Sequence, residues 1–187
     1  MKEEEKKERL ENAKEFTWEV IKVVVISLAI IIPVRYFLIQ PFYVKGASME
    51  PNFHENQYLI IDELSYRFHE PYRGDVVVLH NPTDPSQFFI KRVIGLPGET
   101  IEVKNRHVYI NGQEIDESAY LADTVDTFGN KKETLGENQY YVMGDNRNES
   151  LDSRRFGSIS GDSIIGRTWL RAWPPNKVDH FSQVEYK

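Results

Sequence analysis

The sequence of 187 residues contains no cysteine. Disulfide bonds, thiol catalysis and thiolate metal sites are therefore excluded, and the fold must be held together by packing alone. The five histidines never show the i,i+4 or H-E-x-x-H spacing of a zinc protease, so we expect no metal site. Basic residues are not in excess either, because 23 Lys and Arg face 29 Asp and Glu. The resulting net charge of −6 argues against nucleic acid as a partner.

The chain also lacks an uninterrupted apolar run of the roughly 20 residues that a membrane-crossing helix needs. The apolar run over 23–34 has only 12 residues, which taken alone indicates a buried or interfacial helix. Its flanks favour a span, because Trp18 and Tyr36 are 18 residues apart, or about 27 Å of helix. Aromatic residues at that separation are typical of the two membrane interfaces. We therefore predict a transmembrane anchor over 16–39.

The charges around this segment predict its orientation, since Lys and Arg are retained on the cytoplasmic side. Residues 1–15 form a charged tail whose basic residues are Lys2, Lys6, Lys7, Arg9 and Lys14. We expect a single-pass protein of the cell membrane, with this tail in the cytoplasm and residues 40–187 outside the cell membrane. A cleaved signal peptide is the alternative, but no small-x-small cleavage site occurs over 33–44, directly after the apolar run.

Beyond residue 40 the pattern changes to that of a mainly β domain. Short segments rich in β-branched and aromatic residues are bounded by Gly, Pro, Asn and Asp, which predicts strands over 57–63, 75–80, 88–94, 100–104, 106–110, 139–143 and 163–173. Asn111-Gly112 predicts a tight hairpin turn. An insert is expected over about 105–138, and its polar part, 120–138, is expected to form a flap outside the core. The fold class is thus a transmembrane helix followed by one β-rich domain.

Ser48 is a candidate nucleophile in this domain. It lies just after Gly46 and Ala47 and just before Pro51, which together leave a rigid, uncrowded turn carrying a hydroxyl group. A single serine in a loop is usually only a turn residue. A serine becomes a nucleophile when a base accepts its proton, and a neutral lysine can serve as that base.

Lys91 is the candidate base. If 88–94 is a strand, Lys91 shares one face with Phe89 and Val93, and loss of hydration would favour its neutral form. Catalysis near pH 7–8 requires its pKa to fall by roughly 2–3 units from about 10.4. The alternative is an exposed lysine on an edge strand.

A third segment, 144–154, contains two Asp, two Arg, two Ser, two Asn and one Glu among eleven residues. Such a set can build a network of hydrogen bonds and ion pairs around a buried amine. A solvated loop is one alternative. A calcium loop is another, but its sixth position here is Ser150 where an EF-hand needs Gly.

Four sequence boxes follow one another along the chain: GxSMxP at 46–51, RGDVV at 73–77, KRVIGLPG at 91–98 and GDNR…SxDSR at 144–154. In this order they closely resemble the boxes of type I signal peptidases. Each box alone is weak, but four in order behind an N-terminal anchor are specific. With a single anchor and a short insert, the chain looks most like the compact Gram-positive form of the family.

The resemblance implies a Ser–Lys dyad on a β-rich scaffold, with Ser48 as nucleophile and Lys91 as general base. It also implies that Ser150 holds the Lys91 amine and that the other charged residues of the same loop support it, namely Asp152, Arg154, Asp145 and Arg147. The oxyanion hole would use the Ser48 N–H. Some relatives supply a second donor from a Ser hydroxyl at the position of Gly46, so here the Gly46 N–H is expected to replace it.

The implied activity is a serine endopeptidase that needs no cofactor and removes signal peptides after small-x-small sequences at the outer membrane face. The implied partners are secreted preproteins and the lipid bilayer, close to the secretion translocon, and Phe42, Tyr43 and Phe53 are expected to enter the membrane interface. One alternative is a self-cleaving repressor-type Ser–Lys protease, although that class carries an N-terminal DNA-binding domain. The other is a non-catalytic, membrane-tethered β domain that binds partners, in which Lys91 would be an ordinary surface residue.

Overall fold

The computed structural model describes residues 2–37, 40–122 and 124–181, without the side chains of 2–11 and 33–37. The chain forms two compact units, Met1–Ile39 and Gln40–Lys187.

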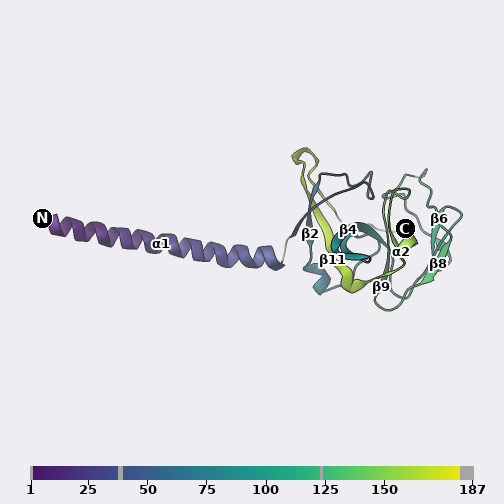
Figure 1. Ribbon diagram of the computed structural model, residues 1–187, viewed down its shortest axis with the longest axis horizontal. Helices are drawn as coiled ribbons and strands as arrows, with labels where there is room; N and C mark the ends of the chain where they lie inside the picture. Colours follow the sequence, from purple (N-terminus) through teal and green to yellow (C-terminus); the bar gives the residue numbers. More distant parts are fainter. Residues whose placement is uncertain (1, 38–39, 123, 182–187) are drawn as a thin grey trace. The chain divides into compact units, whose positions relative to one another are not determined.

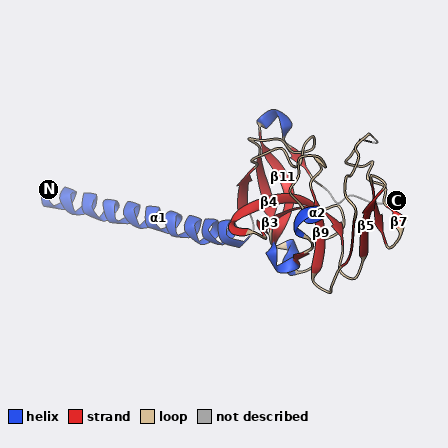
Figure 2. Cartoon of the chain, turned by 45° about the vertical axis from the view of Figure 1, so that its right-hand side comes forward, coloured by secondary structure: helices blue, strands red, loops and turns tan. Residues whose placement is uncertain are grey.

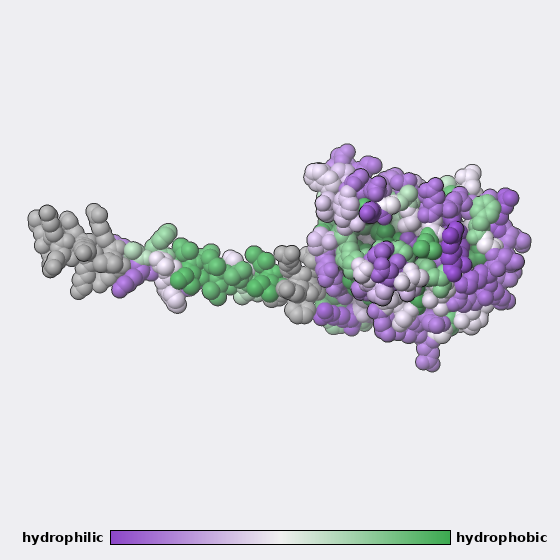
Figure 3. Space-filling view, viewed as in Figure 1, coloured by the Kyte–Doolittle hydropathy of each residue, from purple (hydrophilic) through white to green (hydrophobic). Residues whose placement is uncertain are grey.

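The first unit is a single helix, α1 (Lys2–Phe37), of 36 residues (Figure 1). It joins the charged tail to the apolar segment without a break. The apolar side chains over 20–32 are largely exposed, and they cover the middle of α1 in Figure 3. Among the described residues, no helix reaches the combination of length and hydropathy required for crossing a membrane. The side chain of Tyr36 and the expected end of the anchor at 38–39 lie outside the described residues.

The second unit is built on a large antiparallel sheet (Figure 2). Its strand order is β1-β2-β11-β3-β4-β9-β10, with β12 paired to β11. The bounds are β1 (Gln40–Tyr43), β2 (Tyr58–Asp62), β3 (Val76–Asn81), β4 (Asp84–Gly95), β9 (Gln139–Met143), β10 (Ile159–Ser160), β11 (Ile164–Trp173) and β12 (Asp179–His180). The predicted mainly β fold is confirmed. The short strands β1, β10 and β12 were not predicted, because two to four residues carry too little alternation.

A second sheet of four strands has the order β7-β6-β5-β8. Its strands are β5 (Thr100–Lys104), β6 (His107–Ile110), β7 (Gln113–Glu114) and β8 (Lys131–Thr134). The predicted hairpin turn is confirmed, since β6 pairs with β7 across Asn111 and Gly112. Both turn residues have positive φ, 52° and 84°, which explains the choice of Asn followed by Gly.

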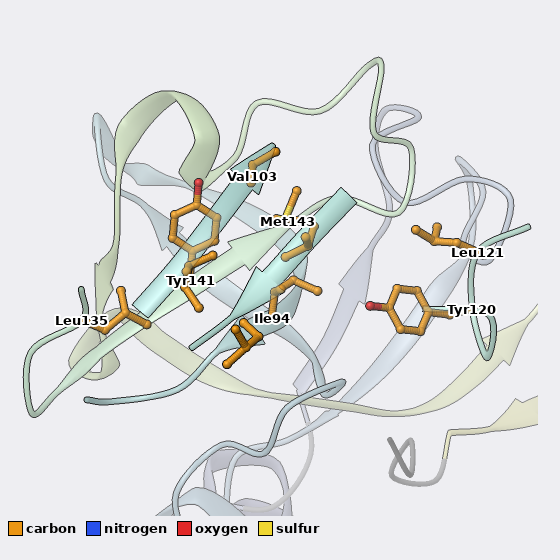
Figure 4. Close-up of a cluster of buried hydrophobic side chains, with 10 residues drawn as sticks. Ile94, Val103, Tyr120, Leu121, Leu135, Tyr141 and Met143 are labelled. Atoms are coloured by element: carbon orange, nitrogen blue, oxygen red, sulfur yellow. The ribbon is translucent and has the colours of Figure 1, made fainter. Parts of the chain in front are cut away.

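The segment 120–138 contributes to the core, contrary to expectation. Tyr120 and Leu121 are each only 7% exposed, and Leu135 is also buried. They belong to the cluster that contains Ile94 and Tyr141, shown in Figure 4. The expectation failed because the apolar residues of this segment are too widely spaced to produce a periodic signal. The polar part of the insert is therefore fastened to the large sheet by buried side chains.

Four short helical turns complete the described part of the domain: η1 (Ser65–Arg67), α2 (Ser153–Phe156), η2 (Gly161–Ser163) and η3 (Pro175–Lys177). The turn α2 matters most for the site, because it directly follows Asp152. The Asp152 carboxylate caps α2 by accepting a hydrogen bond from the Arg154 backbone N–H. A charged residue of the predicted network thus also begins a helical turn.

Candidate active site

Ser48 lies on the compact loop 44–57 between β1 and β2. The loop is closed at its base by hydrogen bonds from the Val44 N–H to the Gln57 carbonyl (2.9 Å) and from the Asn56 N–H to the Val44 carbonyl (3.1 Å). Phe53 is buried in the core, which pins the loop beyond Ser48. The expectation that Phe53 enters a membrane interface is therefore wrong, because its ring is already covered by protein.

The segment 144–154 holds the Ser48 turn from the other side. Asn146 donates two hydrogen bonds to it, from its N–H to the Ser48 carbonyl and from its side-chain amide to the Ala47 carbonyl, both at 3.1 Å. Gly144 packs so closely against this turn that a Cβ atom there would collide with the Ser48 carbonyl oxygen. The resemblance assigned no role to Asn146, although it lies within a quoted box. Its contacts fix the backbone on both sides of the Ser48 amide.

Lys91 reaches Ser48 from β4. Its Nζ lies 2.8 Å from the Ser48 Oγ and 2.8 Å from the carbonyl oxygen of Ile90. The Phe89 ring centroid is 5.0 Å from the same nitrogen, and Lys91 is only 3% exposed. The alternative of an exposed surface lysine is therefore contradicted.

Burial lowers the pKa of Lys91 from its ordinary value of 10.5 to about 8, although the carboxylates of Asp152 and Asp145 partly oppose the shift. Loss of hydration destabilises the ammonium form more than these two acids stabilise it. At pH 7 about one lysine in ten is then neutral. A neutral amine at hydrogen-bond distance from a hydroxyl group can accept its proton.

Asp145 is held by a buried ion pair with Arg92, the residue after Lys91. The guanidinium donates from Nε and Nη2 to the two carboxylate oxygens at 2.8 and 2.6 Å. The Asn52 side-chain amide, from the Ser48 loop, donates to the same carboxylate at 2.9 Å. Asp145 therefore links β4 to the loop that carries Ser48. Sequence reasoning gave Arg92 no role, although it is part of a quoted box.

Arg147 fastens the segment 144–154 to the insert. Its Nη1 and Nη2 donate to the two carboxylate oxygens of Glu117 at 2.9 and 2.5 Å, and its Nε donates to the Gly144 carbonyl at 3.0 Å. Thr127 and Tyr120 complete the group, since Arg147 also donates to the Thr127 hydroxyl and the Tyr120 hydroxyl donates to Glu117. No sequence signal identified Glu117, which is 30 residues away from its partner.

Asp152 and Arg154 form a second buried pair in this segment. Burial acts to raise the pKa of Asp152, but hydrogen bonds from Arg154 and from the Gly144 N–H lower it below its ordinary value. Ser150 is buried beside this carboxylate and also lowers its pKa. Within the described ranges, the Ser150 hydroxyl group makes no hydrogen bond, and therefore none with Lys91. Asp152 is thus ionised and fixed, whereas the expected contact of Ser150 with the amine is not made.

The two expected oxyanion donors differ in their surroundings. The Ser48 N–H has no acceptor within the described part of the chain. The Gly46 N–H instead donates to the Glu55 carboxylate at 3.3 Å. Gly46 has a φ of 87°, a conformation that favours glycine. The Ser48 N–H is therefore available to a ligand, whereas the Gly46 N–H is already engaged.

A small pocket of about 100 Å³ opens beside Ser48 and Lys91. It lies between the segments 42–45 and 88–91, whose rings Phe42 and Phe88 meet edge to face at 5.4 Å between centroids. Its remaining lining residues are mainly apolar: Tyr43, Val44, Lys45, Leu59, Val78, Phe89 and Ile90. A buried lysine that is hydrogen-bonded to a serine beside such a pocket is the arrangement of a Ser–Lys hydrolase.

Comparison with known proteins supplies the family. The family model described as "Signal peptidase, peptidase S26" matches residues 17–173. A probable signal peptidase I-2 from Synechocystis sp. is 38% identical over 181 residues, which cover 93% of this chain and 82% of the relative. The signal peptidase I of Leptolyngbya laminosa is 39% identical, covering 86% and 81% of the two chains. That of Bacillus amyloliquefaciens is 38% identical, covering 84% and 86%.

The chain belongs to the signal peptidase family, peptidase S26. It is accordingly a serine endopeptidase by family, and the resemblance found in the four boxes is confirmed.

Proposed function

We propose that this chain removes signal peptides from secreted preproteins, with Ser48 as the nucleophile and Lys91 as the general base. The observation that carries the proposal is the 2.8 Å approach of the Lys91 Nζ to the Ser48 Oγ, in surroundings that lower the lysine pKa to about 8. The cut is made after the second small residue of a small-x-small sequence. Family membership supports this substrate class.

In the proposed reaction, neutral Lys91 accepts the Ser48 proton while the Oγ attacks the scissile carbonyl carbon. The resulting oxyanion accepts a hydrogen bond from the Ser48 N–H, a kind of contact that contributes about 3–4 kcal/mol to catalysis. The Lys91 ammonium then gives its proton to the leaving amine, which departs as the mature protein. A water molecule, deprotonated by Lys91, hydrolyses the acyl-enzyme and frees Ser48.

The second oxyanion donor is proposed to be the Gly46 N–H, as the resemblance implies. This amide can reach an oxyanion only after it releases the Glu55 carboxylate, to which it donates at 3.3 Å. The length of the contact and its exposure at the surface support this exchange. A carboxylate beside the oxyanion would oppose catalysis, so Glu55 has to turn away when substrate binds.

The five supporting residues have three separate roles in this proposal. Asp145 and Asp152 place carboxylates near Lys91 and keep its pKa from falling further. Arg147 and Arg154 hold the segment 144–154 that touches the Ser48 turn. Ser150 lies buried in the same segment and is proposed to approach the Lys91 amine once Lys91 has moved with the proton.

We also propose that α1 anchors the protein as a single pass through the cell membrane, with the charged tail in the cytoplasm. The Lys and Arg count of the tail and the aromatic residues flanking the apolar segment support this topology. Phe42 and Tyr43, in the strand that follows, would meet the lipid headgroups near the secretion translocon. Protease added outside intact spheroplasts should digest residues 40–187 and spare the tail. Digestion of the tail alone would show that the protein has the opposite orientation in the membrane.

The direct test is cleavage of a preprotein carrying Ala-x-Ala by the purified full chain in detergent. Wild type should release one product whose N-terminus follows the second Ala, and Ser48→Ala and Lys91→Ala should release none. Unchanged cleavage by Lys91→Ala would place the base elsewhere. No cleavage by folded wild type in lipid would favour the non-catalytic alternative.

The pH dependence of kcat/KM should follow the titration of Lys91. Because the base must be neutral, kcat/KM should rise with pH through an apparent pKa of about 8 and level off above it. The rise should approach tenfold per pH unit well below 8. Initial rates at substrate concentrations far below KM, measured between pH 6 and 10, give this profile. A profile that is flat between pH 6 and 9 would contradict Lys91 as the base.

A further inference from the structure

Two unpaired strand edges flank the small pocket. Strand β1 pairs only with β2 among the described strands, and β4 pairs with β9 only from Arg92 onward. The part of β4 before Arg92 therefore has one free edge, and the contact between Phe42 and Phe88 brings it next to β1. An extended peptide can add to such an edge through main-chain hydrogen bonds. This step rests on the proposed function, which supplies the peptide.

Side chains alternate along the segment that leads from β1 to Ser48. Val44 is 4% exposed and packs in the core cluster below the pocket, whereas Tyr43 is 50% exposed and Lys45 is exposed as well. A peptide lying along this edge alternates in the same way. If the two small residues of such a peptide point inward with Val44, the residue between them points outward beside Lys45.

Lys45 is a cation without an ion pair in the part of the chain that the structure describes. It lines the same pocket as Ser48 and Lys91. The carboxylate nearest to it in sequence, that of Glu50, pairs with His54 instead. A charge on the outward face is therefore available to the substrate.

We propose that Lys45 is a specificity-determining residue that favours preproteins with an acidic side chain between the two small residues. An opposite-charge pair across neighbouring strands, partly exposed to water, should change kcat/KM by about 2- to 5-fold. The same position occupied by a basic residue should be disfavoured by a similar factor. The dyad itself is untouched, so the pH profile should not change.

The test compares one preprotein in three versions, Ala-Glu-Ala, Ala-Gln-Ala and Ala-Lys-Ala, cleaved by the full chain in detergent. Wild type should cleave them in the order Glu, Gln, Lys, and Lys45→Glu should reverse the order. Lys132→Glu, the same charge change at an exposed position on β8, should keep the wild-type order. In high salt the preference should shrink, because exposed charges are screened.

Three outcomes are separable. Equal rates for the three versions with wild type would overturn the role of Lys45 and leave the proposed function standing. If Lys45→Glu still cleaves the versions in the order Glu, Gln, Lys, another residue must cause this preference, and the inference would also be overturned. If wild type cleaves none of them, the proposed function fails instead, because Ala-Gln-Ala has no charged side chain and its cleavage does not depend on Lys45.

Discussion

Lys91→Met is expected to give a protein that no longer cleaves preprotein and yet is more stable than wild type at pH 7. Methionine is apolar, unbranched and only one heavy atom shorter than lysine, so it should fill most of the same buried space without a charge. Loss of the base should lower kcat/KM by at least about 1,000-fold. The same burial that makes Lys91 a base should therefore reduce the stability of the fold.

The size of the stability effect follows from the pKa shift. The folded-state pKa of Lys91 is about 8 and its ordinary value is 10.5, a difference of about 2.5 units or roughly 3 kcal/mol. Between pH 8 and 10.5 the unfolded chain binds more protons than the folded one, so wild-type stability rises with pH across this window. Below pH 8 the full penalty applies. Lys91→Met has no such penalty at any pH.

The measurement is the free energy of unfolding by guanidinium chloride, for wild type and Lys91→Met in the same detergent at pH 7, 9 and 10.5. The variant should be more stable by roughly 3 kcal/mol at pH 7, and the difference should shrink toward zero at pH 10.5. Lys132→Met, at an exposed position, should show no such trend. Equal stability of wild type and Lys91→Met at pH 7 would mean that Lys91 is hydrated and ordinarily charged.

Much of the site could be predicted from the sequence because its residues are close to one another within each box. Ser48 and Lys91 are 43 residues apart, yet each is recognisable by its local surroundings, a small-residue turn and an apolar strand. Alternation placed Lys91 beside Phe89 on one strand face, and the observed ring contact agrees. The predicted strands were recognisable for the same reason, since β-branched residues recur within a few positions.

The contacts that sequence reasoning missed depend on three-dimensional neighbours without local signals. Glu117 lies in a polar stretch with no periodic pattern, and only the fold brings it to Arg147. The carboxylate of Glu55 reaches Gly46 because the loop 44–57 closes on itself, which no spacing rule predicts. Asn146 was visible within a box, but its role depends on which carbonyl groups face it. The sequence thus predicted most of the long strands, but it did not predict which segments lie next to one another in the fold.

Glu117→Ala should be the most damaging single change outside the dyad and its immediate neighbours. The Arg147 side chain is 0% exposed and that of Glu117 only 14%. Burial acts to lower the pKa of Arg147, but the Glu117 carboxylate raises it above the ordinary value, so the guanidinium stays charged. Removing one partner of such a pair leaves an uncompensated buried charge and destabilises a fold by about 3–5 kcal/mol.

The change should also reduce catalysis, because Arg147 holds the segment that touches the Ser48 turn. With Glu117 removed, Arg147 should shift toward water and loosen its hydrogen bond to the Gly144 carbonyl. Gly144 packs directly on the Ser48 carbonyl oxygen, so kcat should fall more than KM rises. Guanidinium unfolding and the preprotein cleavage assay measure the two effects on the same preparation.

A double variant separates loss of the pair from loss of the segment. Glu117→Leu combined with Arg147→Met replaces the two charges by apolar side chains of similar volume and should recover most of the stability lost in Glu117→Ala. Glu149→Ala, an exposed acid in the same segment, should change neither stability nor kcat appreciably. The free energy of unfolding of Glu117→Ala could instead lie within about 1 kcal/mol of the wild-type value. Arg147 would then have found another partner or water, and the insert would not brace the active site. Full activity in the double variant would show that the segment 144–154 needs only well-packed side chains at positions 117 and 147. Reduced activity with recovered stability would show that the segment needs the directional hydrogen bonds of the Arg147 guanidinium group.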